Sequence, residues 1–411
     1  MSLEPRFLQI HTLTPYAGAL LNRDDVGRAK RLPFGGAERI RVSSQCLKRH
    51  WRTAAGAWSL ADLAPLSVRS RLTFVREIAE PLAAEYDPAA VKAVVEAFQA
   101  VLLGESAKAR AEKEGRAGDG ADAALDALET GQVLVLGRPE VEFIREAART
   151  LLEAAVTPTD ARRAVEAHIK QTRANLEALR MAAGLDGALF GRMVTSDILA
   201  RGDAAVHVAH SFTVHAEESE PEFFTAVDDL LKDGGGLGSG MVGESELTSG
   251  LFYGYVVVDL PLLVANLEGC DTTDWLRADR TLAAKVVEHL VQLIASVSPG
   301  AKLGSTAPYA YADTVLLELG RRQPRTLANA FLKPVAAREA EGGLRAAALA
   351  RLDAHLRQFD RVYGAGEARR AVGLDLPDGF AVADAGGLDA LCAWAADAVR
   401  TGAAEAGMVP A

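Results

Sequence analysis

The first regular pattern in the chain lies at residues 7–13, which read FLQIHTL. Apolar and polar side chains alternate there, and a period of about two residues is typical of a strand with one buried face. Pro15 follows, and a proline commonly ends a strand because it has no amide hydrogen to donate. The pattern therefore predicts a first strand at 7–13, followed by a long loop.

The next pattern has helical spacing. Ser43 and Ser44 offer hydroxyl groups that can cap a helix, and apolar residues recur at positions 47, 51, 54, 55 and 58. From about residue 60 to residue 185 the sequence is rich in Ala, Leu, Glu and Arg and repeats the 3.6-residue helical period. We therefore expect one helix after Ser43 and then a helical insertion.

Three more strand patterns and one helix pattern follow this block. Residues 205–215 alternate, residues 251–260 are apolar, β-branched or aromatic, and residues 310–319 form a fourth strand pattern. An amphipathic helix is expected from about Trp275 to Val297. With the helical block set aside, the order is strand, helix, strand, strand, helix, strand. This order predicts an α+β fold of the ferredoxin-like kind, which is the plan of RNA-recognition-motif domains.

The pattern divides the chain into four parts. Residues 1–59 and 191–340 form the two parts of the ferredoxin-like domain, residues 60–190 form an inserted helical domain, and residues 341–411 form a C-terminal helical region. The second and third strands are joined by a long connection at 216–250. Connections of this length inside a compact domain are usually functional or disordered.

Charge distribution changes this picture. The chain has a formal charge of −10 and a pI near 5.4, which alone would argue against nucleic-acid binding. Residues 23–52, however, hold nine basic and three acidic residues, a local charge of +6, so that the rest of the chain carries −16. One cationic segment on an acidic body is expected to bind a polyanion at one place.

Other kinds of chemistry are disfavoured. The three cysteines, Cys46, Cys270 and Cys392, are odd in number and far apart, which argues against a disulfide framework or a zinc finger and fits a reducing cytoplasm. The sequence shows no secretion signal, and no apolar run reaches the roughly 18 residues that a membrane span requires. We therefore expect a cytoplasmic protein with no membrane partner.

No metal or cofactor site is expected either. Asp24 and Asp25 are adjacent, but without a further cluster of ligands such carboxylates more often pair with neighbouring arginines. His207, His210 and His215 do not share one face, because strand alternation places His210 opposite the other two. The sequence also lacks a G-x-S-x-G motif and the His-Asp dipeptide of an HD nuclease.

The cationic segment carries a specific motif. Residues 22–53 read NRDDVGRAKRLPFGGAERIRVSSQCLKRHWRT and, with His11, closely resemble the N-terminal signature of the CasC backbone subunit of the type I-E CRISPR Cascade complex. Three further blocks resemble that family in the same order: GRMVTSD at 191–197, FFTAVDDL at 223–230 leading into SGLFY at 249–253, and GAK at 300–302. The resemblance extends from near residue 7 to at least residue 335.

The resemblance implies a non-catalytic, hand-shaped subunit with an RNA-recognition-like palm, a helical finger domain and a thumb loop at 216–250. Copies of such a subunit polymerise along the crRNA together with other Cascade subunits. The thumb kinks the guide, and the bases between the kinks stay free to pair with target DNA in antiviral defence. The implied partners are therefore crRNA, target DNA through the guide, further copies of the chain and other Cascade subunits.

The expected contacts with RNA follow from this segment and from the matching blocks. Basic side chains beside a helix N-terminus form a favourable site for phosphates. The expected RNA-binding residues are Arg23, Lys30, Arg41, Ser43, Gln45, Lys48, Arg49, Arg52, Met193, Thr225 and Lys302. Phe223, Phe224 and Leu237 are expected at the thumb as base wedges, although core packing explains the two phenylalanines equally well.

Two other functions stay open. The same fold could serve as a CRISPR RNA-processing endonuclease with a histidine as general base. A protein-interaction scaffold without RNA is the third possibility.

Overall fold

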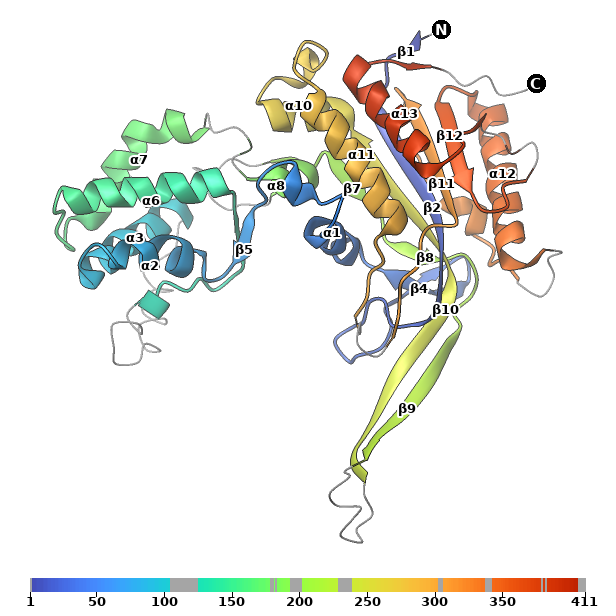
Figure 1. Cartoon of the computed structure of the whole chain (residues 1–411), viewed down its shortest axis with the longest axis horizontal. Helices are drawn as coiled ribbons and strands as arrows, with labels where there is room; N and C mark the ends of the chain where they lie inside the picture. Colours follow the sequence, from blue (N-terminus) through green and yellow to red (C-terminus); the bar gives the residue numbers. More distant parts are fainter. Residues whose placement is uncertain are drawn as a thin grey trace. The chain divides into compact units, whose positions relative to one another are not determined.

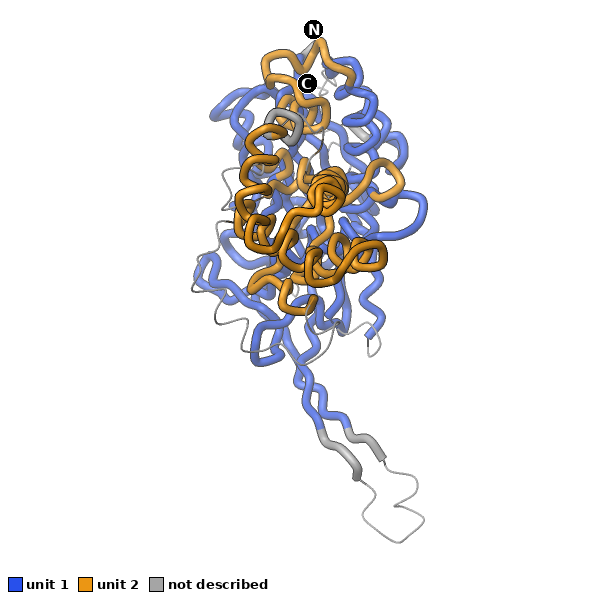
Figure 2. The backbone as a smooth tube through the Cα atoms, turned by 90° about the vertical axis from the view of Figure 1, so that its left-hand side faces the viewer, with its two compact units in different colours: residues 1–60, 207–260, 280–411 blue, residues 61–206, 261–279 orange. Residues whose placement is uncertain are grey.

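The computed structural model describes residues 2–103, 125–177, 181, 183–192, 202–227, 239–301, 306–336, 342–377, 380 and 383–405. They form two compact units, shown in Figure 2. Unit 1 comprises residues 1–60, 207–260 and 280–411, and unit 2 comprises residues 61–206 and 261–279. Residues 261–279, which the sequence pattern placed with the second part of the palm, thus cluster with the helical block.

Unit 1 is built on one large sheet (Figure 1), whose strands follow the order β13-β12-β11-β2-β10-β8-β4-β3. Strands β7 and β9 also pair with β10. The bounds are β2 Phe7–Ala19, β3 Arg31–Phe34, β4 Ala37–Val42, β7 Val206–Val208, β8 Ser211–Thr213, β9 Ser219–Val227, β10 Ser239–Asp259, β11 Thr314–Gly320, β12 Ala368–Gly373 and β13 Ala383–Asp384. Strands β1 (Ser2–Leu3) and β14 (Ala404–Glu405) form a separate pair.

The four strands predicted from the sequence lie side by side at the centre of this sheet. Their order is β11-β2-β10-β8, and each neighbouring pair is antiparallel. Helix α1 (Ser44–Thr53) follows the first of them, and helix α11 (Thr281–Ser296) precedes the last. Leu47 of α1, Ile294 of α11 and the strand residues Thr12 and Val256 line one small cavity. The two helices therefore cover the same face of the sheet.

The first strand is longer than predicted, because β2 continues through Pro15 to Ala19. Strand β11 accompanies β2 only from Phe7 to Leu13, whereas β10 pairs with it as far as Ala19. Among the described strands, β2 thus has a neighbour on one side only at Pro15. A proline is tolerated there because no ladder hydrogen bond requires its missing amide hydrogen.

The predicted long loop after this strand contains a hairpin instead. Strands β3 and β4 pair antiparallel, and the turn residues Gly35 and Gly36 have φ values of +64° and +79°. Two successive positive φ values are typical of the tight turns that join paired strands. The two adjacent glycines in the Phe34-Gly35-Gly36-Ala37 sequence are a local indication of this turn.

The helix predicted after Ser43 is present. The Ser43 side chain caps it by accepting a hydrogen bond from the Cys46 amide at 3.3 Å. The helix ends at Thr53 and does not reach Trp58, which the helical spacing had included.

Helix α12 (Gly343–Tyr363) covers the opposite face of the sheet together with a 3₁₀ turn at Ala328–Phe331. Leu349 and Leu352 of α12 pack in one core with Leu13, Tyr253 and Leu316 of the strands. Helix α13 (Leu388–Thr401) lies beside α11. The central strands are therefore sandwiched between helices, as their largely buried sequences require.

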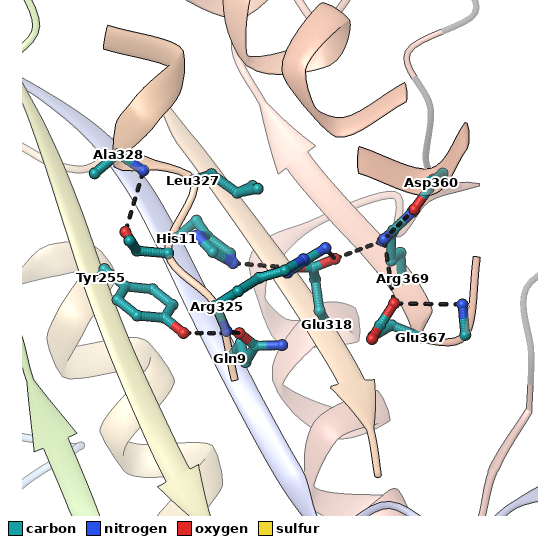
Figure 3. A network of polar contacts seen from close by, with 12 residues as sticks. Gln9, His11, Tyr255, Glu318, Arg325, Leu327, Ala328, Asp360, Glu367 and Arg369 are labelled. Atoms are coloured by element: carbon teal, nitrogen blue, oxygen red, sulfur yellow. Dashed lines mark hydrogen bonds and ion pairs between the residues drawn. The ribbon is translucent and has the colours of Figure 1, made fainter. Parts of the chain in front are cut away.

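A buried polar network lies on the α12 face (Figure 3). Glu318 of β11, with a fully buried side chain, accepts hydrogen bonds from Arg325 (2.5 and 2.8 Å), Arg369 (2.5 Å) and His11 Nε2 (3.0 Å). Arg369 continues the network to Asp360 of α12. Burial raises the pKa of Glu318, but the hydrogen bonds from Arg325 and His11 outweigh burial and hold the pKa well below its ordinary value. The network ties β2, β11, β12 and α12 together.

Unit 2 is mainly helical and has its own core, which includes Phe74, Ile78, Val94, Phe98 and Ile144. Its elements are a π-helix at Thr73–Ala79, α2 Glu80–Ala83, α3 Pro88–Leu103, α6 Arg138–Glu153, α7 Ala161–Glu177, α8 Leu185–Phe190, α10 Leu260–Glu268, and the paired strands β5 Val68–Ser70 and β6 Leu134–Leu136. In the described part of the chain, no helix combines the length and apolar character that crossing a bilayer would require.

Candidate nucleic-acid interface

The cationic segment folds as a loop, a hairpin and helix α1. The loop is closed by a bridge between Arg23 and Ala29. Asp24 shapes it, since its carboxylate accepts hydrogen bonds from the amides of Val26 (3.1 Å) and Arg28 (2.8 Å). Asp24 therefore caps a turn through backbone amides, where an arginine side chain had been the expected partner. Among the described residues, no group of His, Cys, Asp and Glu is arranged to hold a metal ion.

The loop is fastened to the beginning of α1. The Ser43 amide donates to Asn22 Oδ1 at 3.0 Å, while the Ser43 hydroxyl caps the helix. On α1, Gln45 and Arg49 are one turn apart and exposed, and Lys48 and Arg52 are one turn apart and half-buried. The structure thus brings the loop and both rows of helix residues to one region of unit 1.

Lys30 and Arg41 lie together beside this region. The Arg41 amide donates to the Lys30 carbonyl at 2.8 Å, and Arg41 Nη1 lies 3.1 Å from His210 Nδ1. Burial and the positive charges of Arg41 and Lys30 all lower the pKa of His210. A neutral imidazole can accept a hydrogen bond from Arg41, so His210 supports the guanidinium without adding positive charge.

Two arginines counted in the cationic segment have structural roles. The Arg39 side chain is fully buried and donates to the carbonyls of Thr213 (2.9 Å), His215 (3.1 Å) and Phe331 (2.9 Å). Such a guanidinium joins three segments but cannot reach a ligand at the surface. The other arginine, Arg31, is held by carboxylates. The expectation that all nine basic residues form one cationic surface is therefore too simple.

Arg31 connects the cationic segment to the strands that follow His215. Its Nε donates to Glu217 Oε1 at 2.7 Å, and its Nη2 pairs with Glu246. The other oxygen of Glu246 accepts from the Ala29 amide at 2.6 Å. We call Arg31, Glu217 and Glu246 the arginine clamp. Sequence patterns could not reveal it, since its carboxylates lie 186 and 215 positions away from Arg31.

The connection predicted as a thumb loop at 216–250 is largely paired strand. Strand β9 pairs with the first part of β10, from Ser219 opposite Thr248 to Val227 opposite Ser239. This projecting hairpin, residues 219–227 and 239–248, extends from the sheet of unit 1 in Figure 1. The second half of β10 continues into the sheet and pairs with β2. One strand thus runs from the body of unit 1 into the hairpin.

The two phenylalanines of the hairpin differ in exposure. Phe223 is 71% exposed and Phe224 is 40% exposed. Phe224 lies opposite Gly243, and its ring occupies the space above that glycine, where a Cβ atom would lie only 2.4 Å from the ring. Phe224 therefore packs against the hairpin itself, while Phe223 projects into solvent.

Three predicted contact residues, Met193, Leu237 and Lys302, lie outside the described residues. Thr225 belongs to β9 opposite Val242, and only its backbone position is described. The roles assigned to these four residues stay predictions.

These features define a mixed α/β protein in which a basic loop and helix adjoin a long projecting hairpin. Residues 8–394 match the CT1975-like protein family, and the chain belongs to this family. It is also similar to a chain of the structure "CRISPR RNA-guided surveillance complex, pre-nicking", with a TM-score of 0.73 and 26% identity, covering 96% of this chain and 100% of that one. A chain of "CRISPR RNA-guided surveillance complex" shares the fold, with a TM-score of 0.55, 22% identity and coverage of 95% and 99%. Comparison with curated proteins finds no match.

Proposed function

We propose that the chain is the non-catalytic crRNA-binding backbone subunit of a type I-E CRISPR surveillance complex, as the CasC-like motifs suggest. The observation that carries this proposal is the similarity to a chain of an RNA-guided surveillance complex over almost the full length of both chains. Family membership over residues 8–394 supports it. The crRNA and the other subunits of the complex are its proposed partners, in the cytoplasm.

The strand order supports an RNA-recognition-like palm. Along the sheet, the four central strands occur in the order fourth, first, third and second of the chain, with α1 and α11 on one face. We assign this arrangement to the ferredoxin-like plan. RNA-recognition domains use this plan to present the sheet and its loops to single-stranded RNA.

The chemistry of the cationic segment suits the sugar–phosphate backbone of a guide. Arg23, Arg49 and Gln45 are exposed, and Lys30 and Arg41 lie close together beside the same loop. Contacts with phosphates position a nucleic acid without reading its sequence. A guide carrier needs this property, because the guide sequence differs from one complex to another while base pairing supplies the specificity.

The projecting hairpin is proposed as the thumb that kinks the guide. Phe223, with 71% of its surface exposed, provides the apolar side chain that can enter between bases. Further copies of the chain would follow one another along the crRNA, each leaving a run of bases free to pair with target DNA.

The surroundings of His11 make this histidine a poor candidate for the general base of an RNA-processing enzyme. His11 is 1% exposed, and its two nitrogens lie 2.9 Å from Tyr253 Oη and 3.0 Å from Glu318 Oε2. Burial lowers the pKa of His11 despite the neighbouring Glu318. A general base must reach the proton that it removes, so this histidine is better explained as a member of the buried network.

The proposal is tested by co-expressing the chain with its neighbouring subunits and a CRISPR array. Purified complexes should contain a discrete RNA of guide length, and the isolated chain should leave repeat RNA uncut with or without EDTA. Turnover of repeat RNA by the isolated chain would refute the non-catalytic assignment. Complexes that assemble without RNA would refute the guide-binding assignment and favour a protein-interaction scaffold.

A further inference from the structure

Two exposed tyrosines lie close to the candidate interface, in the segment that leads into β11. Tyr309 is 75% exposed and Tyr311 is 74% exposed. Neither residue belongs to the basic loop, to α1 or to the projecting hairpin. Tyrosine side chains combine a large flat apolar ring with low conformational entropy, which makes them efficient contact residues.

The backbone that carries them is held firmly at alternate residues. The Ser298 hydroxyl contacts both ends of Ala310, accepting from its amide at 2.9 Å and donating to its carbonyl at 2.8 Å. The Ala312 amide donates to the Ala295 carbonyl at 2.7 Å, and Pro308 is buried. Residues 308, 310 and 312 are thus anchored, whereas 309 and 311 project. A rigid display of this kind reduces the ordering cost of binding.

The same segment is joined to the cationic segment by short links. The Gly300 amide donates to His50 Nε2 of α1 at 3.3 Å, and the Ala301 amide donates to the Leu20 carbonyl at 3.0 Å. Leu20 lies two residues before Asn22, where the basic loop begins. The tyrosines therefore stand on a support that contacts α1 and the residues just before the basic loop.

We propose that Tyr309 and Tyr311 form a stacking platform for unpaired bases of a single-stranded nucleic acid held along the cationic segment. This inference rests on the proposed function and extends its site. Every base has a π-face, so stacking on an aromatic ring tolerates any sequence. Ring contacts of this kind complement phosphate contacts, because they hold bases without reading their hydrogen-bonding edges.

The platform is tested with the full chain and fluorescein-labelled single-stranded RNA, using anisotropy at several salt concentrations. The paired change Tyr309→Leu with Tyr311→Leu removes the aromatic faces and keeps apolar bulk, and it should weaken binding by about 5- to 150-fold for each base unstacked. The slope of log affinity against log salt should not change, because every phosphate keeps its basic partner. The paired phenylalanine variant should bind like the wild type. Tyr363→Leu, which alters another exposed tyrosine of unit 1, should also have no effect.

Repeating the measurement with assembled complexes and single-stranded target DNA separates two sources of the bases. A loss confined to guide RNA assigns the platform to the guide, and a loss confined to target DNA assigns it to the target strand. Leucine variants that bind both nucleic acids as tightly as the wild type would overturn the platform. The same conclusion holds if only complex assembly is impaired, because that result would indicate a contact with protein. A wild-type chain that binds no single-stranded RNA would overturn the proposed function itself.

Discussion

The arginine clamp gives a sharp test of how the projecting hairpin is held to the basic loop. Replacing Arg31 by methionine removes both ion pairs while keeping most of the side-chain volume. Glu217 and Glu246 would then lie near each other without a cation between them. The side chains of Arg31, Glu217 and Glu246 are 25%, 20% and 14% exposed, respectively. Exposed ion pairs contribute about 0–1 kcal/mol, and breaking a buried pair costs about 3–5 kcal/mol. For a cluster of intermediate exposure we expect the substitution to lower the local stability by about 2 kcal/mol.

This loss should be local to the base of the hairpin. Residues 216–227, 239–248 and 24–34 should exchange their amide hydrogens about 30-fold faster in Arg31→Met, since 1.4 kcal/mol corresponds to a factor of ten. Hydrogen exchange followed by mass spectrometry measures this rate segment by segment. Arg28→Met is the matched control, because it removes the same charge three residues earlier in the chain but alters an exposed side chain. Combining Arg31→Met with Glu217→Gln and Glu246→Gln should restore part of the protection, because the unbalanced carboxylates are gone.

The clamp also has a defined pH dependence. The hydrogen bond from Arg31 lowers the pKa of Glu217, despite partial burial. A carboxyl group with a lowered pKa in the folded state adds stability above its unfolded pKa of about 4.3, and this stability is lost as the pH falls through the folded value. The difference in exchange between wild type and Arg31→Met should be complete at pH 7 and should shrink below about pH 4. Equal hairpin protection in wild type, Arg31→Met and Arg28→Met at pH 7 would refute the reasoning.

Three further predictions address the interface and the fold. Exchanging Arg23 and Arg49 for glutamine should leave the melting temperature unchanged and lower the salt slope of RNA binding by about 0.7 for each phosphate that is no longer neutralised, which anisotropy titrations measure. Gly35→Ala should destabilise the protein by at least about 2 kcal/mol in urea unfolding, because the new Cβ would lie 1.5 Å from the Leu332 carbonyl oxygen at a φ of +64°. Glu318→Gln should lower the free energy of unfolding by about 3–5 kcal/mol in the same assay, because it leaves buried guanidinium groups without their carboxylate. An unchanged urea midpoint would show that the network adds nothing to stability.

The central strands and α1 could be predicted from the sequence because their signals are local. The β2 sequence alternates apolar and polar residues, although residues 8–13 are all buried in the sheet, and Ser43 caps a helix whose spacing is visible within one or two turns. The strand order could not be predicted. It depends on pairings such as that of β2 with β11, which joins residues about 300 positions apart, and no local pattern encodes such a pairing.

The strands of the projecting hairpin escaped prediction for a different reason. Residues 219–224 are all exposed, because a two-stranded ribbon that leaves the body of a protein has no buried face. Alternation of apolar and polar residues reports burial of one face, so it vanishes where both faces meet solvent. Phe224 over Gly243 is the kind of cross-strand contact that stabilises such a ribbon, and it becomes visible only once the register is known.

The cationic segment shows why a charge count alone describes a binding surface poorly. The +6 of residues 23–52 treats all basic residues alike, yet the segment contains two populations. Arg39 is buried among carbonyls, and Arg31 is neutralised by Glu217 and Glu246, which lie outside the counted window. Arg23, in contrast, is exposed on the loop beside the arginine clamp. The structural arginines fix the loop and the hairpin base, and the exposed ones are left to meet phosphates. Arg31 and Arg23 should therefore respond differently to substitution, the first through hairpin protection and the second through the salt dependence of RNA binding.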